Sequence, residues 1–342
     1  MGLGALTASF ALISQVAHGG RLDAARRLFP NAPEPWIDLS TGVNPRAYPA
    51  QTWPDSALTR LPDENAFKTL EAAARVAYRP PPDAQVVSGA GVQTFIQIMP
   101  RAFTARRVAI LGFTYAEHAA CWRDAGAQIT NVDTIEELSE ADVAVIVNPN
   151  NPDGRLIPVP ELSTLAQKMA RRGALVVVDE SFMDFMPQHS FAASTALDGV
   201  IVLRSFGKTY GLPGLRLGFA LCALGPAKRL RSLLGPWAVC GPALAIGAQA
   251  LQDRDWLATA ALCQQRDAMR LDDLLQKAGF DIVGGCGLFR LAYHRDARTR
   301  FLSLCQHGVL TRDFAERPAW LRFGLPGNED EWSRLAAALE VR

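Results

Sequence analysis

The sequence predicts an α/β fold in which a mostly parallel sheet is flanked by helices, together with a smaller α+β domain. Short runs of Val, Ile and Leu recur from about residue 85 onward without strict alternation, which is typical of strands buried on both faces. Amphipathic stretches lie between these runs, and strands that alternate with helices favour a parallel sheet. The chain has 342 residues, enough for about two domains of roughly 100–200 residues each.

The elements of the large sheet follow one another in a regular order. The expected strands are residues 85–88, 107–111, 143–147, 174–178, 200–204 and 217–222, and the expected helices are residues 92–103, 116–125 and 160–172. Ligands bind at the carboxyl ends of the strands in such sheets. We therefore expect the chemistry in the loops that leave these strands.

The pattern changes after Pro226. The expected elements of this second region are helices at residues 227–234 and 242–278 and short strands at residues 288–292, 308–311 and 320–323. This division predicts a large domain at residues 41–225 and a small domain at residues 226–342. Residues 1–40 are expected to pack with the small domain and the active site.

Composition and charge argue against several classes of protein. Residues 1–17 are apolar but carry no Lys or Arg, and they match neither a signal peptide nor a membrane helix of about 20 residues. The net charge of +1, from 35 basic and 34 acidic residues, disfavours a nucleic-acid binder. The six cysteines form no C-x-x-C pair, and the histidines show no metal-ligand spacing. We expect a cytoplasmic protein with no metal and no membrane or nucleic-acid partner.

Two glycine-containing motifs each lack a required residue. Residues 206–209 read Phe-Gly-Lys-Thr, but a phosphate-binding P-loop needs glycine where this chain has Val202. Residues 89–91 read Gly-Ala-Gly after a strand, but the third glycine of a dinucleotide fingerprint would fall on Thr94. A nucleotidase and a Rossmann dehydrogenase are therefore disfavoured.

Four strand ends carry residues suited to a ligand. Residues 88–91, Ser-Gly-Ala-Gly, either let backbone N–H groups approach an anion or form a tight turn. Residues 148–154, Asn-Pro-Asn-Asn-Pro-Asp-Gly, offer amides to a ligand or to local backbone. The acid pair Asp179 and Glu180 needs a cation or hydrogen bonds there, and a helix cap or a structural ion pair would also satisfy it. The fourth strand end carries Ser205, Lys208, Gly211, Gly214 and Arg216.

Lys208 differs in context from the other four lysines of the chain. Those four, which fall in amphipathic helical patterns, are Lys68, Lys168, Lys228 and Lys277. Lys208 lies in a glycine-punctuated loop after a buried strand, which makes it a candidate nucleophile toward an aldehyde. Ser205 and Arg216 flank it and can hold a phosphate.

One cofactor accounts for all four strand ends. Pyridoxal 5'-phosphate needs a lysine for its aldehyde, an acid for its pyridine nitrogen and an anion cradle for its phosphate. The acid keeps the ring protonated, so that the ring can accept electrons. We therefore predict a pyridoxal-phosphate enzyme with Lys208 and Asp179 as catalytic residues.

These motifs resemble the fold-type-I pyridoxal-phosphate enzymes of the aspartate aminotransferase superfamily, and the histidinol-phosphate aminotransferases among them. The N-P-N-N-P-x-G block, the D-E pair and the S-x-x-K-x-x-x-x-x-G-x-R block occur in the order of that family. The resemblance runs from His18 to about Gly327. It implies the type I fold and a homodimer with both sites at the subunit interface.

Four shorter segments are similar to the threonine-phosphate decarboxylases of cobalamin biosynthesis. They are residues 18–20, 38–45, 115–118 and 321–327. Such enzymes convert L-threonine O-3-phosphate to (R)-1-amino-2-propanol O-2-phosphate and carbon dioxide. The resemblance implies this activity, with a histidinol-phosphate-type aminotransferase as the alternative.

The resemblance also implies a cofactor role for each matching residue. Lys208 matches the lysine that holds the aldehyde, Asp179 the partner of the ring nitrogen and Asn151 the partner of the phenolic oxygen. Tyr115 matches the aromatic residue that stacks on the ring, a role its neighbour His118 can share. The residues that match the phosphate cradle are Gly89, Ala90, Gly91, Ser205 and Arg216.

The substrate residues are implied in the same way. Arg322 matches the arginine that binds the substrate α-carboxylate, and Arg312 is a candidate for a second substrate anion. His18 and Asn44 lie in the segment that closes over the substrate. The bond at Cα that stands perpendicular to the ring is the one that breaks, so we expect Arg322 to select between decarboxylation and transamination. Lys208 is expected to return a proton to Cα.

Three residues depart from the aminotransferase pattern. Phe182 replaces a tyrosine that contacts the phenolic oxygen, Gly207 replaces a serine that contacts the phosphate, and Leu61 replaces a tyrosine that the partner subunit brings to the phosphate. These departures weaken a generic aminotransferase assignment, while the lysine, the acid and the arginine remain. A non-catalytic pyridoxal-phosphate-binding regulator is disfavoured, because such regulators usually carry an added DNA-binding domain.

Overall fold

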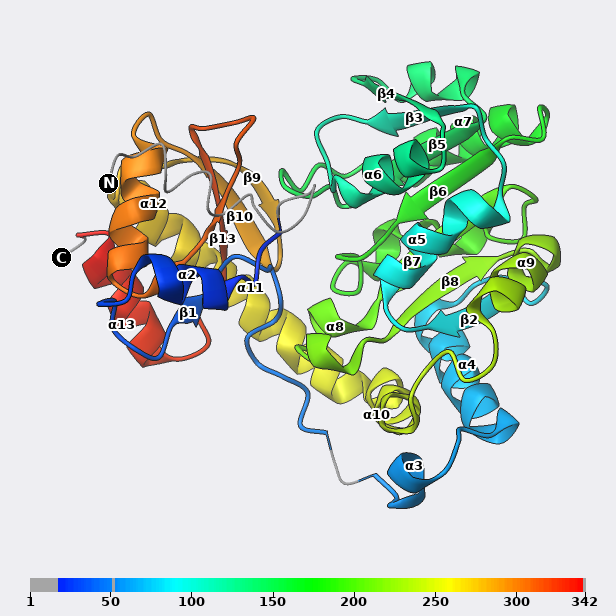
Figure 1. Cartoon of the computed structure of the whole chain (residues 1–342), viewed down its shortest axis with the longest axis horizontal. Coiled ribbons are helices and arrows are strands. Elements are labelled where there is room, and N and C mark those ends of the chain that lie inside the picture. Colours follow the sequence, from blue (N-terminus) through cyan, green and yellow to red (C-terminus); the bar gives the residue numbers. More distant parts are fainter. Residues whose placement is uncertain (1–17, 51–52, 341–342) are drawn as a thin grey trace. The chain divides into compact units, whose positions relative to one another are not determined.

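The computed structural model describes residues 18–50 and 53–340, which form two compact units. The larger unit comprises Ala47–Asn151 and Arg155–Ala261. The smaller unit comprises, of the described residues, 18–46, Pro152–Gly154 and 262–340. Figure 1 shows both units and labels most of their helices and strands. The expected packing of residues 1–17 falls outside the described residues.

The larger unit is built on a seven-stranded sheet with the order β2-β8-β7-β6-β5-β3-β4. Its strands are β2 (Gln85–Gly89), β3 (Arg107–Leu111), β4 (Gln128–Val132), β5 (Val143–Val147), β6 (Leu175–Asp179), β7 (Val200–Ser205) and β8 (Gly218–Cys222). In this sheet β8 runs antiparallel to both its neighbours, and the other pairs are parallel. The predicted mostly parallel sheet is confirmed, with β4 added at its edge.

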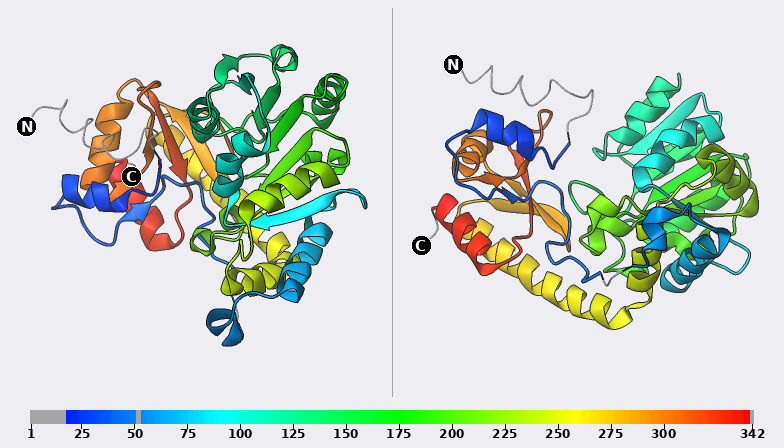
Figure 2. Two further views of the ribbon diagram at one scale, coloured as in Figure 1. Left: turned by 45° about the vertical axis from the view of Figure 1, so that its right-hand side comes forward. Right: turned by 60° about the horizontal axis from the view of Figure 1, so that its bottom comes forward.

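Helices cover both faces of this sheet, as Figure 2 shows. One face packs against α5 (Val92–Ala102), α6 (Glu117–Asp124) and α9 (Leu224–Leu234). The other face packs against α4 (Glu64–Tyr78), α7 (Val159–Ala170) and α10 (Gly241–Gln252). Alternate residues of each strand enter the two layers, which explains why the strand sequences lack strict alternation.

Several short elements complete the larger unit. They are α3 (Ser56–Thr59), α8 (Phe206–Thr209), η1 (Glu136–Glu140), η2 (Pro187–His189), η3 (Phe191–Ser194) and η4 (Pro213–Leu215). The single-turn helix α8 directly follows β7, so it begins at the carboxyl edge of the sheet.

The smaller unit contains a four-stranded antiparallel sheet with the order β12-β13-β10-β9. Its strands are β9 (Asp281–Cys286), β10 (Phe289–Tyr293), β12 (Arg312–Asp313) and β13 (Trp320–Gly324). A separate parallel pair joins β1 (Ile37–Asp38) to β11 (Val309–Leu310). The helices of this unit are α2 (Leu22–Leu28), α12 (Ala297–Gln306), α13 (Glu329–Ala338) and the part of α11 (Arg254–Lys277) from Leu262 onward. An apolar core that includes residues of β1, β13 and these helices holds the unit together.

The boundaries between the units differ from the expected positions at residues 40 and 225. The first falls after Arg46, and the last lies inside α11 (Arg254–Lys277), between Ala261 and Leu262. The reason is that α9 and α10 bury apolar faces in the two layers of the large sheet. The long helical pattern expected at 242–278 is interrupted at Asp253, whose carboxylate accepts a hydrogen bond from Trp256 N at 2.9 Å.

No helix in the described part of the chain is both long enough and apolar enough to span a membrane.

Candidate active site

A cavity of about 190 Å³ opens at the carboxyl edge of the large sheet. The residues proposed above that line it are Gly91, Tyr115, Asn151, Asp179, Ser205, Lys208 and Arg216. They come from loops and strand ends far apart in the sequence, and the parallel strands bring them together because their carboxyl ends share one edge. Gly89, the last residue of β2, and Ala90, in the turn before α5, precede Gly91 but do not line the cavity.

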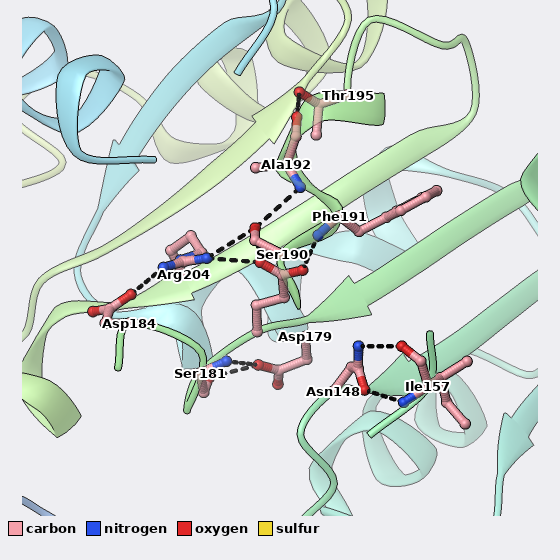
Figure 3. A network of polar contacts seen from close by, with 11 residues as sticks. Asn148, Ile157, Asp179, Ser181, Asp184, Ser190, Phe191, Ala192, Thr195 and Arg204 are labelled. Carbon is pink, nitrogen blue, oxygen red and sulfur yellow. Dashed lines mark hydrogen bonds and ion pairs between the residues drawn. The ribbon is translucent and has the colours of Figure 1, made fainter. Parts of the chain in front are cut away.

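Asp179, the last residue of β6, is buried and has hydrogen-bond partners on both carboxylate oxygens. Its Oδ1 accepts from Ser181 N at 3.0 Å and from Ser181 Oγ at 2.5 Å. Its Oδ2 lies 3.0 Å from Nε2 of His118, a buried residue of α6 (Figure 3 shows the Ser181 contacts). These three contacts hold the carboxylate in one orientation at the cavity wall. His118 therefore contacts Asp179 and does not line the cavity, which differs from its expected share in ring stacking.

Glu180 points to the opposite side of the sheet from Asp179, because side chains alternate along a strand. Its carboxylate is paired with Arg204 and is completely buried. The Asp-Glu pair thus divides: Asp179 lines the cavity, and Glu180 forms the structural ion pair that was the alternative interpretation.

Lys208 lies on α8, and its Nζ is 5.4 Å from the centre of the Phe182 ring. Both residues line the cavity. Stacked aromatic rings pack against this helix. Phe206 stacks on Tyr210 with ring centroids 4.4 Å apart, and Tyr210 stacks on Trp256 with centroids 5.5 Å apart. This packing restricts the backbone that carries the lysine.

The turn between β2 and α5 is shaped to bring an anion close to backbone. Gly91 has φ +83°, which favours glycine, and a Cβ there would lie 2.9 Å from Arg216 Nη2. The guanidinium therefore lies against the glycine at the first turn of an 11-residue helix. Backbone N–H groups and a fixed positive charge at a helix N-terminus together form a suitable phosphate site.

Tyr115 lies beside the same helix and is mostly buried. Its hydroxyl donates to Gln93 Oε1 at 3.1 Å, and Gln93 Nε2 donates to Glu117 Oε2 at 2.7 Å. Burial, with a smaller contribution from Glu117, raises the pKa of Tyr115 well above its usual value. The tyrosine stays neutral at ordinary pH and presents an aromatic surface to the cavity.

The asparagines of the Asn-Pro-Asn-Asn block have different roles. Asn148 exchanges two hydrogen bonds with the backbone of Ile157, at 2.8 and 3.2 Å (Figure 3). Asn150 Nδ2 donates to Phe113 O at 3.1 Å, and Asn150 N donates to Arg155 O. Asn151 lines the cavity. The first two asparagines therefore shape the loop that presents the third.

The four predicted substrate residues lie in the smaller unit. Arg322 of β13 is buried, donates a hydrogen bond to Ser40 O and lies 5.0 Å from the centre of the Phe289 ring. Arg312 of β12 stands directly opposite Arg322 in the antiparallel register. Asn44 is buried, and its Oδ1 accepts from Arg46 N at 3.0 Å. His18 is half-buried at the start of the described chain.

Two contacts at the site were not expected from the sequence. The contact between His118 and Asp179 depends on tertiary packing of α6 against the sheet, and no spacing in the sequence indicates it. The hydrogen bonds from Ser181 to Asp179 follow a local i, i+2 pattern that Asp and Ser commonly form, so the Asp-x-Ser spacing could have predicted them.

Comparisons with known proteins agree on one family. The family model of aminotransferases of class I and II matches residues 57–339. A threonine-phosphate decarboxylase of Pseudomonas aeruginosa is 42% identical over 94% of this chain and 96% of its own length. A second one, from a Sinorhizobium species, is 40% identical over 95% of this chain and 97% of its length. A histidinol-phosphate aminotransferase of Methylobacillus flagellatus is 27% identical over 87% of this chain and 85% of its length.

Solved structures show the same fold. The histidinol-phosphate aminotransferase of Clostridium acetobutylicum superimposes with a TM-score of 0.79 at 20% identity, covering 89% of this chain and 98% of that one. The L-threonine-O-3-phosphate decarboxylase of Porphyromonas gingivalis gives a TM-score of 0.73 at 20% identity, with the same coverage. The architecture is thus common to proteins with both activities.

Proposed function

The chain belongs to the class I and II aminotransferase family, and from that premise we propose that it catalyses the pyridoxal-phosphate-dependent decarboxylation of L-threonine O-3-phosphate. The products are (R)-1-amino-2-propanol O-2-phosphate and carbon dioxide, in cobalamin biosynthesis. One observation carries the proposal: the two threonine-phosphate decarboxylases described above share 42% and 40% identity with this chain, whereas the histidinol-phosphate aminotransferase described above shares 27%.

The residues of the cavity fit this cofactor. A buried carboxylate with fixed orientation, Asp179, suits a protonated ring nitrogen. A Cβ at Gly91 would fill the space in front of the Arg216 guanidinium, so the glycine leaves room for a phosphate. Lys208 and Asn151 line the same cavity and would hold the aldehyde and the phenolic oxygen.

When bound, pyridoxal phosphate supplies an aldehyde for the substrate amine and a ring that accepts the electrons released at Cα. Asp179 holds a proton on the ring nitrogen and so keeps the ring electron-accepting. Lys208 would hold the aldehyde through its Nζ, and the same amine, once free, would be the proton donor to Cα. Tyr115 offers its ring surface for stacking.

The pair of arginines in the smaller unit suits an anionic substrate. Two like charges directly opposite on neighbouring strands repel each other. Burial, followed by the charge of Arg312, lowers the pKa of Arg322 to about 10. An anion that binds there relieves both effects, because it pairs with the guanidinium groups. We assign the α-carboxylate to Arg322 and a second substrate anion to Arg312, with His18 and Asn44 as further contacts.

The chain's assembly and compartment belong to the same proposal. The family resemblance supports a homodimer with the active sites at the subunit interface. Six free cysteines, two of them at intermediate exposure and one exposed, fit a reducing cytoplasm.

The direct test uses purified protein, L-threonine O-3-phosphate and no keto acid. We expect release of carbon dioxide by the wild type and none by Lys208→Ala, because that variant lacks the amine. Amino transfer from histidinol phosphate to 2-oxoglutarate without carbon dioxide release would instead assign the aminotransferase activity. If the protein binds no pyridoxal phosphate, the whole assignment fails.

A further inference from the structure

A charged cluster lies inside the apolar layer on the sheet face that carries α4, α7 and α10. It consists of Glu180, Asp184 and Arg204, which are 0%, 7% and 2% exposed. Arg204 Nη1 lies 2.7 Å from Glu180 Oε2. Arg204 Nη2 donates to Asp184 Oδ1, a contact that Figure 3 shows. Glu180 also accepts from Ser190 Oγ at 2.6 Å and from Phe191 N at 2.5 Å. Both oxygens of Glu180 are therefore bound.

The cluster lies directly behind the residues that line the cavity. Glu180 follows Asp179 in the chain, and Arg204 precedes Ser205. Side chains alternate across a strand, so Asp179 and Ser205 face the cavity while Glu180 and Arg204 face the opposite layer. Lys208 is four residues beyond Arg204 and is the third residue of α8, which directly follows β7. The cluster thus holds the same backbone that carries the acid and the lysine.

Stability alone does not account for this cluster. One guanidinium serves two buried carboxylates, and Asp184 Oδ2 and Arg204 Nε have no hydrogen-bond partner among the described residues. Burial raises the pKa of Glu180 even though Arg204 opposes that shift. Apolar residues of similar volume commonly replace such buried charges with no loss of stability.

We propose that Glu180, Asp184 and Arg204 are positioning residues for the reaction, which fix the ends of β6 and β7 and with them the separation of Asp179 and Lys208. The planar guanidinium has donors at fixed angles, and it binds one carboxylate on each of two nitrogens. It therefore ties the end of β7 both to the residue after β6 and to Asp184. This inference rests on the proposed function, because it concerns the placement of that site's acid and lysine.

The test separates positioning from stability by comparing two sets of substitutions. Arg204→Met alone leaves two buried carboxylates unpaired, and we expect Tm to fall by about 10 °C. The triple variant Arg204→Met/Glu180→Gln/Asp184→Asn removes all three charges and keeps an acceptor for Phe191 N. We expect its Tm to return to near the wild-type value. Both variants are compared for pyridoxal-phosphate affinity of the apo-protein, the pH dependence of bound-cofactor absorbance, and kcat and KM.

The triple variant decides the question. If the cluster positions the site, pyridoxal-phosphate affinity stays at least tenfold weaker than in the wild type. We then also expect kcat to stay about 100-fold lower, since displacing reacting groups by about 1 Å has that effect. Recovery of Tm, cofactor affinity and kcat together would show a structural role only and would overturn the proposal.

Arg204→Lys covers the case in which the triple variant does not fold. It keeps the positive charge but loses the planar fork, so it contacts the carboxylates without fixing their angle. We expect a folded protein with cofactor affinity about tenfold weaker. Wild-type affinity and turnover in this variant would overturn the proposal.

Asp142→Asn is the matched control. Asp142 Oδ2 accepts from Arg106 N and Arg107 N, each at 2.9 Å. These residues lie where β3 and β5 begin, at the end of the strands opposite to the cavity. This variant should change Tm without changing cofactor affinity. If the wild type releases no carbon dioxide from threonine phosphate, the proposed function fails, but the cofactor affinities still report whether the cluster positions the site.

Discussion

The backbone at Gly207 leaves no space for a side chain. A Cβ at this position would lie 2.7 Å from Pro213 Cα and 3.3 Å from Leu212 O. The family resemblance predicts serine here, with its hydroxyl on the cofactor phosphate. In this chain the loop that ends at η4 packs against α8 instead, so the missing serine contact and the close approach of Pro213 have the same physical cause.

Gly207→Ser is therefore expected to destabilise the protein. The new side chain collides with backbone atoms that cannot rotate away, and overpacking of this kind costs about 1–3 kcal/mol. Thermal unfolding followed by circular dichroism measures the effect. Gly214→Ser is the matched control in the same loop, since a Cβ there has no heavy atom within 4 Å, and its Tm should not change. A wild-type Tm for Gly207→Ser, with tighter cofactor binding, would contradict the prediction.

At the scale of single elements, the first turn of α5 depends on one glycine. Gly91 combines a positive φ with close approach of Arg216, whereas Gly126 has a similar φ of +90° and no atom within 4 Å of its Cβ position. A comparison of the same substitution at the two glycines therefore distinguishes the effect of the positive φ from the effect of a side chain placed against Arg216. Arg216 itself adopts φ +51°, a backbone conformation that is uncommon for a residue other than glycine.

Gly91→Ala should lose cofactor affinity, and Gly126→Ala should not. Both variants lose about 1 kcal/mol of stability from the positive φ. Only the methyl group at residue 91 displaces the guanidinium, and loss of a charge-assisted hydrogen bond weakens binding by about tenfold or more. Titration of each apo-protein with pyridoxal phosphate measures the dissociation constant. Equal affinities for the two variants would mean that the phosphate lies elsewhere.

At the scale of the whole molecule, the sequence predicted what depends on local patterns. The strands of the large sheet were recognisable because burial on both faces demands continuous apolar runs. The edge strand β4 was missed because it is largely exposed and its residues Gln128, Thr130 and Asn131 are polar. The compact units divide inside α11 and not at the expected residue 225, because α9 and α10 bury apolar faces against the large sheet, and their own sequence does not indicate which sheet they pack on.

The candidate site, like the fold, was predictable where it depends on local sequence patterns. Lys208, Asp179 and Asn151 were noticed because charged or amide residues at the ends of buried strands are unusual, and all three line one cavity. Their catalytic roles stay predictions. Three features arise from tertiary packing, which the spacing of residues along the chain does not indicate. They are the different roles of Asn148 and Asn151, the contact of His118 with Asp179 and the approach of Pro213 to Gly207.

The proposed homodimer makes a prediction about the surface of the larger unit. The segment around α3 exposes Trp53, Leu58 and Leu61, and the two leucines are 69% and 67% exposed. Neighbouring exposed apolar side chains of this kind mark association surfaces. Leu61 also occupies the position where the family resemblance places a residue that the partner subunit brings to the phosphate. We therefore expect this segment to lie in the interface between two copies of the chain.

Leu58→Glu/Leu61→Glu is expected to convert the dimer to a monomer, because each buried carboxylate at an interface lacks a partner and loses its hydration. Sedimentation velocity over a concentration series measures the change. Leu224→Glu, at a half-exposed position that begins α9 on the other face of the sheet, should stay dimeric. Because the active sites are expected at the interface, the monomer should also lose cofactor affinity while keeping its circular dichroism spectrum. A double variant that stays dimeric would place the interface on another surface of the protein.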